Sequence, residues 1–130
     1  MYLLDTNVVG EIARNPGGPL AARIASLPAG EFGIDPIVAA EIEYGLVKRD
    51  SKRLRRQVEA ILEAVPVFDL PSALPAYYGS LRSALERRGT PIGPNDLLIA
   101  AHALAADLTV VTKNEQEFRR VQGLKVENWG

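Results

Sequence analysis

The sequence predicts an α/β domain with a mostly parallel central sheet flanked by helices. Short apolar runs alternate with longer helical segments, and this alternation is typical of parallel sheets whose strands are connected by helices. The clearest strand is 108–112, where β-branched and apolar residues predominate. The chain has no internal repeat and no linker long enough to separate two domains, so we expect one domain over residues 1–130.

Composition narrows the class of protein. The chain has 130 residues, 47% apolar and 24% charged, with a net charge of −1; this is typical of a globular protein and not of a strongly basic nucleic-acid-binding chain. The absence of cysteine excludes disulfides, zinc–thiolate sites and thiol catalysis, and fits a reducing compartment. No apolar run approaches the roughly 18 residues of a membrane span, and no signal core precedes the first strand. We therefore expect a cytoplasmic protein without a membrane partner.

Five short apolar runs are predicted to form the strands. Each is bounded by turn-forming or acidic residues, as expected for strands of a small α/β domain. In chain order they are residues 2–4, 31–34, 66–68, 108–112 and 124–127. Asp5 directly follows the first run and Asp69 follows the third, so both aspartates are expected at strand ends.

The helices between these runs are predicted from their start and stop signals. Pro19 suits the first turn of a short helix, and Asp35-Pro36 combines an acidic cap with a proline at the first helical position. Gly89 ends another helix directly after Arg87-Arg88, which suit the negative end of a helix dipole. The expected helices are 8–14, 19–27, 36–49, 57–65, 72–88 and 94–106.

The last of these helices, opening at Gly93 or Pro94, is predicted to be buried at the centre of the fold. After Asp96 it is apolar on nearly every face and is interrupted only by His102, which we expect to be a packed core residue and not a ligand. The helix dipole favours Asp96 in the first turn, yet a charge at the mouth of a buried helix is costly unless it is used. Asp96 is therefore a candidate site residue as well as a dipole cap.

Four acidic residues are expected to converge at one edge of the sheet. Ligands bind beyond the carboxyl ends of parallel strands, where Asp5 ends the first strand and Glu117 follows the strand ending at Thr112. Asp96 opens the helix that leads to that strand, and Glu41 can join from a neighbouring helix. Clustered carboxylates raise one another's pKa, and Mg²⁺ or Mn²⁺, which prefer oxygen ligands, resolve the repulsion. With one histidine and no cysteine, a zinc site is not expected.

Four blocks of sequence resemble the PIN-domain ribonucleases, specifically the VapC-type toxins of bacterial type II toxin–antitoxin pairs. The blocks are LLDTN at 3–7, AAEIEYG at 39–45, GTPIGPNDLLIAAHALA at 89–105 and VVTKNEQEFRRVQGLKVENW at 110–129. They span nearly the whole chain, and IGPND with the closing GLKVENW favours the VapC branch. The resemblance implies a single PIN-like nuclease domain and a Mg²⁺-dependent endoribonuclease, with Mn²⁺ able to substitute, that leaves 5′-phosphate and 3′-hydroxyl ends.

The resemblance also implies the site residues. Asp5, Glu41 and Asp96 occupy the family's three main acidic positions, which bind the metal ion and are catalytic. Glu117 matches the fourth, catalytic acid, and its greater length leaves open whether it or Asn114 completes the site. The positions that support the acids are Thr6, Asn7, Thr112 and Asn114.

Two positions depart from the family pattern. Asp35 stands where a serine-like residue is expected, and Val38 stands where threonine is common. Two interpretations of Asp35 remain open: a peripheral carboxylate of the site, or the cap of the helix that begins at Pro36.

The partners follow from the same resemblance. The family partner is a small VapB-like antitoxin whose C-terminal segment covers the active groove. The family usually forms homodimers within a larger toxin–antitoxin complex, in which only the antitoxin contacts operator DNA. The toxins most similar in these motifs cleave initiator tRNA in the anticodon region, so tRNA is the RNA substrate we expect.

Two other functions remain open on the sequence alone. A receiver-like phosphoacceptor domain would use Asp69, but receivers need an acidic pair after the first strand, and here Thr6-Asn7 follows Asp5. A catalytically silent interaction module is the other alternative. Residues 48–56, which hold six of the 15 basic residues, are either a solvated face or a patch for RNA phosphates.

Overall fold

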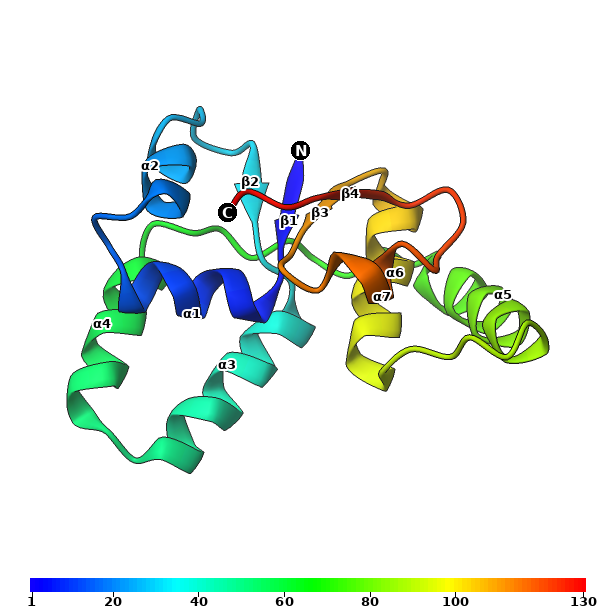
Figure 1. Cartoon of the computed structure of the whole chain (residues 1–130), viewed down its shortest axis with the longest axis horizontal. Helices are drawn as coiled ribbons and strands as arrows, with labels where there is room; N and C mark the ends of the chain where they lie inside the picture. Colours follow the sequence, from blue (N-terminus) through cyan, green and yellow to red (C-terminus); the bar gives the residue numbers. More distant parts are fainter.

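A four-stranded parallel sheet in the order β2-β1-β3-β4 forms the centre of the protein (Figure 1). The computed structural model describes residues 1–130. The strands are β1 (Tyr2–Leu4), β2 (Phe32–Gly33), β3 (Thr109–Val111) and β4 (Lys125–Glu127). In the sheet Val111 pairs with Leu4 on one side and with Glu127 on the other, so the strands from the two ends of the chain finish at the same edge. The predicted α/β class with a parallel sheet is confirmed.

The predicted strand over 66–68 is wrong, because this segment forms only a single bridge to the sheet. Val67 pairs in parallel with Ile34, and two hydrogen bonds hold the contact: Ile34 N–H donates to the Pro66 carbonyl at 3.0 Å, and Phe68 N–H donates to the Ile34 carbonyl at 2.7 Å. Pro66 has no N–H with which to extend the ladder. The segment therefore lies beside the end of β2 without becoming a strand.

Seven helices surround the sheet. They are α1 (Thr6–Arg14), α2 (Pro19–Ala25), α3 (Pro36–Arg49), α4 (Lys52–Leu62), α5 (Leu74–Arg87), α6 (Pro94–Ala106) and α7 (Glu115–Phe118). Several boundaries differ from the prediction by a few residues, as at both ends of α5 and at the end of α2. Two of the differing starts have a local reason: α1 begins at Thr6 because Asp5 caps it, and α4 begins at Lys52 because the Ser51 hydroxyl accepts the Leu54 N–H at 3.1 Å. The sequence did not predict the four-residue helix α7.

The helices pack in two groups on the sheet. α1 packs against α2, α3 and α4, and α3 with α4 forms a hairpin that extends away from the sheet (Figure 1). α6 packs against α5, α3 and β3, and it contributes six buried residues to the core. His102 is one of them, at 1% exposed, so its predicted place in the core is confirmed. No helix combines the length and the apolar character needed to cross a membrane.

Gly33 in β2 lies where a larger residue does not fit. A Cβ at this position would lie 2.7 Å from the Pro66 carbonyl oxygen and 2.8 Å from Cζ of Phe68. We expect Gly33→Ala to lower the free energy of unfolding by about 1–3 kcal/mol, because the segment over 66–68 must move away from β2. Urea unfolding measures the change.

Gly45→Ala in α3 is the matched control. A Cβ there meets nothing within 4 Å, and alanine is the better helix former, so stability should stay equal or rise. Unchanged stability of Gly33→Ala would contradict the close packing of these two segments.

Candidate active site

The carboxyl edge of the sheet brings Asp5 and Thr112 together from opposite ends of the chain. Asp5 N–H donates to the Val111 carbonyl at 3.0 Å, which extends the pairing of β1 with β3 by one residue. The Thr112 hydroxyl donates to Oδ2 of Asp5 at 2.9 Å, and the Thr6 N–H donates to Oδ1 at 2.7 Å. Asp5 is only 3% exposed, so these two donors orient a carboxylate that water hardly reaches.

Glu41 reaches the same edge from α3 and is held by residues of two other helices. The Thr6 hydroxyl at the start of α1 donates to Oε1 of Glu41 at 2.7 Å. The Asn95 amide at the start of α6 donates to Oε2 at 3.3 Å. The sequence did not single out Asn95 as a site residue, although its place next to Asp96 was a signal that could have found it.

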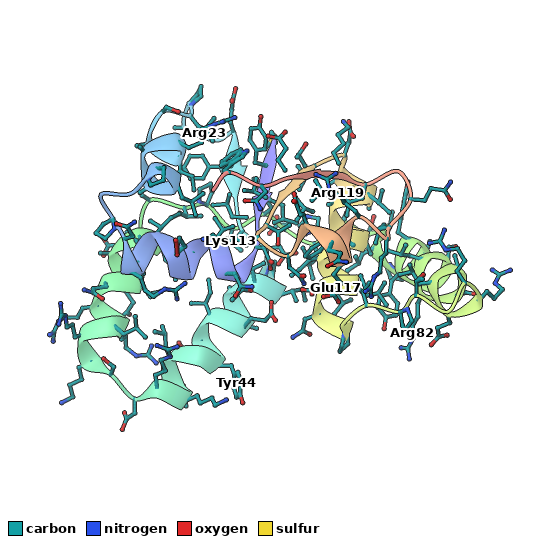
Figure 2. The ribbon with its side chains drawn as sticks, in the orientation of Figure 1. Arg23, Tyr44, Arg82, Lys113, Glu117 and Arg119 are labelled. Carbon is teal, nitrogen blue, oxygen red and sulfur yellow. The ribbon has the colours of Figure 1, made fainter.

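Glu117 lies on α7, and its side chain reaches the backbone at the start of α6 (Figure 2). Its Oε1 accepts the Gly93 N–H and its Oε2 accepts the Asn114 amide N–H, both at 2.6 Å. Asn114 is in turn held by its own N–H, which donates to the Thr112 hydroxyl at 2.9 Å. A Cβ at Gly93 would lie 3.6 Å from Oε1 of Glu117 and 3.8 Å from Oδ2 of Asp96, so both carboxylates approach the backbone that opens α6.

Burial and mutual repulsion raise the pKa of Asp96 to about 7. Burial is the largest cause, and the charges of Asp5, Glu117 and Glu41 add to it. Burial also raises the pKa of Asp5, against the lowering effect of its hydrogen bonds from Thr112 and Thr6. The four predicted acids are therefore close enough to interact electrostatically.

The pKa of Glu117 is shifted in the opposite direction to that of Asp96. Burial acts to raise the pKa of Glu117, but the hydrogen bonds from the Gly93 N–H and Asn114, the charge of Arg120 and the bond with Asp96 together lower it below its usual value. The same bond raises the pKa of Asp96. In the metal-free protein at neutral pH, Asp96 is thus the acid of the cluster that most readily stays protonated.

The donor chemistry of the cluster fits a hard divalent cation. Carboxylate oxygens are the ligands that Mg²⁺ and Mn²⁺ prefer, and the chain has no cysteine to favour zinc. No three acidic or histidine side chains are arranged around one point as metal ligands would be. Both oxygens of Glu41 and of Glu117 are instead used by protein donors, so these side chains would exchange some of those hydrogen bonds for a cation.

Asp35 is not part of this cluster, and its interpretation as a peripheral carboxylate is wrong. Its Oδ1 accepts the Val38 N–H at 2.8 Å, which caps α3, and its Oδ2 lies 2.9 Å from Nδ1 of His102. Asp35 is completely buried. The predicted cap is therefore confirmed, with a partner in α6 that the sequence did not indicate.

Asn7 and Asp69 form no hydrogen bond with the four acids, and Asp69 lies away from them. Asn7 is exposed and lines a groove between α1, α3 and α4 together with Thr6 and Glu41, but its side chain makes no hydrogen bond with an acid. Asp69 is exposed beyond the segment that bridges to Ile34, on the side of β2 away from β1. The structure thus provides no acidic cluster around Asp69 of the kind that a receiver domain needs.

Comparison with known proteins identifies the family. The model of the PIN domain matches residues 2–124. The chain is 37% identical to ribonuclease VapC2 of Rickettsia felis, covering 99% of this chain and 98% of that protein. It is 33% identical to the tRNA(fMet)-specific endonuclease VapC of Shigella flexneri, covering 98% and 97% of the two chains. The chain belongs to the PIN-domain family.

Similarity to a solved structure identifies the branch of the family to which the chain belongs. A chain in the crystal structure of VapBC2 from Rickettsia felis, bound to a DNA fragment from the promoter, superposes with a TM-score of 0.90 at 35% identity, covering 99% of this chain and 98% of that one. Together with the VapC ribonucleases above, this similarity places the chain in the VapC branch of the family, as its motifs predicted.

Asp96 should make the stability of the metal-free protein depend on pH. Its pKa rises from 3.8 to about 7 on folding, so between these values the folded state holds a proton that the unfolded chain releases. The free energy of unfolding therefore falls as the pH rises through this range. The rise in pKa corresponds to about 4 kcal/mol, and solvent screening at this partly buried carboxyl reduces the expected loss to on the order of 2 kcal/mol. We expect Asp96→Asn to be more stable than the wild type near pH 8 and equally stable near pH 4, as measured by urea unfolding in EDTA.

Asp69→Asn is the matched control, because it removes an exposed carboxylate outside the cluster. Its stability should follow the wild type at both pH values. If Asp96→Asn were instead less stable than the wild type near pH 8, the carboxylate would have a structural role.

Proposed function

We propose that this protein is the toxin of a type II toxin–antitoxin pair and acts as a Mg²⁺-dependent endoribonuclease. The observation that carries the proposal is the gathering of Asp5, Glu41, Asp96 and Glu117 at the carboxyl edge of the sheet, where burial and the charges of the other three acids raise the pKa of Asp96 to about 7. A divalent cation would relieve that repulsion. The VapC ribonucleases that are similar over nearly the full chain support RNA as the substrate.

In this proposal residues 1–130 form a single nuclease domain. Asp5, Glu41 and Asp96 would hold Mg²⁺, or Mn²⁺ in its place, and Glu117 would complete the acidic site. When bound, the ion would orient a water and stabilise negative charge on the phosphate. Hydrolysis would break the bond between phosphorus and the 3′ oxygen and leave 5′-phosphate and 3′-hydroxyl ends.

The remaining residues would orient the acids. Thr112 donates to Asp5, Thr6 donates to Glu41, and Asn114 donates to Glu117, so three of the four acids are each fixed by a neutral side chain. Because the donors are neutral, they position the carboxylates without cancelling the charge that would attract a cation. Asn7 would contribute to the groove beside the site.

The proposed substrate is tRNA, and initiator tRNA in particular, because one relative carries the name tRNA(fMet)-specific endonuclease. Cleavage of tRNA would inhibit translation and would place the protein in the cytoplasm. The proposed partner is a VapB-like antitoxin, within a larger complex built on a toxin homodimer. Contact with DNA would belong to the antitoxin. The crystal structure of VapBC2 bound to a DNA fragment from the promoter supports DNA binding by such a complex.

Purified protein should cleave a discrete tRNA when total bacterial tRNA is incubated with Mg²⁺ or Mn²⁺, and EDTA should abolish the cleavage. We expect Asp5→Asn and Asp96→Asn each to lower the cleavage rate by about a hundredfold or more, because one of the ion's proposed ligands is lost. Gel electrophoresis and sequencing of the product ends measure the rate and the cleavage site.

A test variant and its control distinguish loss of a site carboxylate from loss of any nearby carboxylate. Glu117→Gln should lower the rate, whereas Glu115→Gln in the same short helix should not, since Glu115 pairs with Arg119. Absence of cleavage of tRNA, ribosomal RNA and messenger RNA by folded protein with either metal would contradict the enzyme and favour the catalytically silent module.

Co-expression with a VapB-like antitoxin from the same genome should yield a stable complex. We expect the complex to lack ribonuclease activity and to shift promoter DNA in a gel, whereas the toxin alone should not shift it. Light scattering of the isolated toxin measures the proposed homodimer. DNA binding by the toxin alone would contradict the assignment of DNA contact to the antitoxin.

A further inference from the structure

Two polar contacts link α3 and α6, the helices that carry Glu41 and Asp96. The Asn95 amide donates to Oε2 of Glu41 over 3.3 Å at the mouth of the site, and Nδ1 of His102 lies 2.9 Å from Oδ2 of Asp35 in the core. Along α3 the chain runs from the buried contact to the mouth, and along α6 it runs from the mouth to the buried contact. The helices are therefore antiparallel and are joined by polar contacts roughly two turns apart.

The buried contact uses both oxygens of one carboxylate. Oδ1 of Asp35 caps α3 by accepting the Val38 N–H at 2.8 Å, which leaves Oδ2 for the imidazole of His102. Asp35 is 0% exposed and His102 is 1% exposed, so water does not compete for either group. Because a carboxylate only accepts hydrogen bonds, Nδ1 carries the proton in this contact. The side chain of Asp35 thus fixes the start of α3 and also the position of α3 against α6.

A gain in stability does not by itself explain why a buried carboxylate–imidazole pair lies in this core. Apolar residues of similar volume often stabilise a core as well as a buried polar or charged pair does. A hydrogen bond differs from an apolar contact because it has a preferred distance and direction, so it selects one arrangement of the two helices. The residues that such an arrangement would affect most are the acids farther along these helices.

We propose that Asp35 and His102 are positioning residues of the active site, whose hydrogen bond sets the separation of Glu41 from Asp96. The inference rests on the proposed function in that these two carboxylates are taken to bind the metal ion. Neither Asp35 nor His102 touches the ion or the RNA; they act through the helices. A small displacement of either acid would then weaken metal binding and slow cleavage without changing how RNA binds elsewhere.

The double variant Asp35→Ser/His102→Leu tests the proposal without leaving an unpaired buried group. Serine keeps the cap of α3, and leucine fills the space of the imidazole. We expect a folded protein in which the dissociation constant for Mn²⁺ rises about tenfold and kcat falls about tenfold, while KM for RNA stays unchanged. Leu20→Ala in α2 is the matched control: it removes a buried side chain, at 5% exposed, and should lower stability but leave Mn²⁺ affinity unchanged.

A distance measurement tests the geometry independently of metal and activity. The chain has no cysteine, so spin labels can be attached selectively at Val47→Cys in α3 and Ala106→Cys in α6, both exposed positions. We expect a narrow distribution of label distances with the pair intact and a broader or shifted one in the double variant. An unchanged distance distribution in the double variant would overturn the proposal. If the wild type binds Mn²⁺, an unchanged Mn²⁺ affinity in the double variant would overturn it as well.

The same measurements separate this inference from the proposed function. If the wild-type protein binds Mn²⁺ but cleaves no RNA, the proposed function fails while the distance and affinity comparisons still decide the role of the pair. If the wild type binds no Mn²⁺, the distance distribution decides alone. Should the double variant not fold, His102→Asn, which keeps a donor near the position of Nδ1, is compared with His102→Leu; equal distance distributions in these two would overturn the proposal.

Discussion

The parallel pairing of β1 with β3 is the constraint on which the acidic site depends. It joins Leu4 to Val111, residues from opposite ends of the chain, and ends both strands at one edge. Asp5 then lies beside Thr112, whose hydroxyl and backbone neighbours extend the contact to Asn114 and so to Glu117. Loss of this pairing would separate the first acid from the last one, whatever the helices did.

Three of the four acids are positioned by the N-terminal ends of helices. Asp5 caps α1, Asp96 and Glu117 lie in the first turns of α6 and α7, and a helix N-terminus favours a negative charge. Neutral donors hold Asp5, Glu41 and Glu117, but Asp96 has its pKa raised to about 7 by burial and the other carboxylates. The cluster is thus ordered without being neutralised, which is the condition under which a hard cation gains most from binding.

Elements with local signals could be predicted from the sequence, and elements that depend on tertiary contacts could not. Asp35-Pro36 and Pro94 predicted the starts of α3 and α6, since caps and prolines act within one helical turn. The segment over 66–68 resembles a strand in composition, but only its single contact with Ile34 decided that it forms a bridge. Helix α7 is too short for any periodicity to predict it.

By itself the sequence determined which side chains can carry charge, where α2, α3 and α6 begin and which helix is apolar enough to be central. Its motifs also placed Asp5, Glu41, Asp96 and Glu117 in the pattern of a PIN-domain nuclease. Only the tertiary structure decided that Asp35 pairs with His102 and that Asn95 holds Glu41. The physical reason is that a side chain's hydrogen-bond partner and the water it loses on burial depend on residues distant in the chain, and these same two quantities determine its pKa.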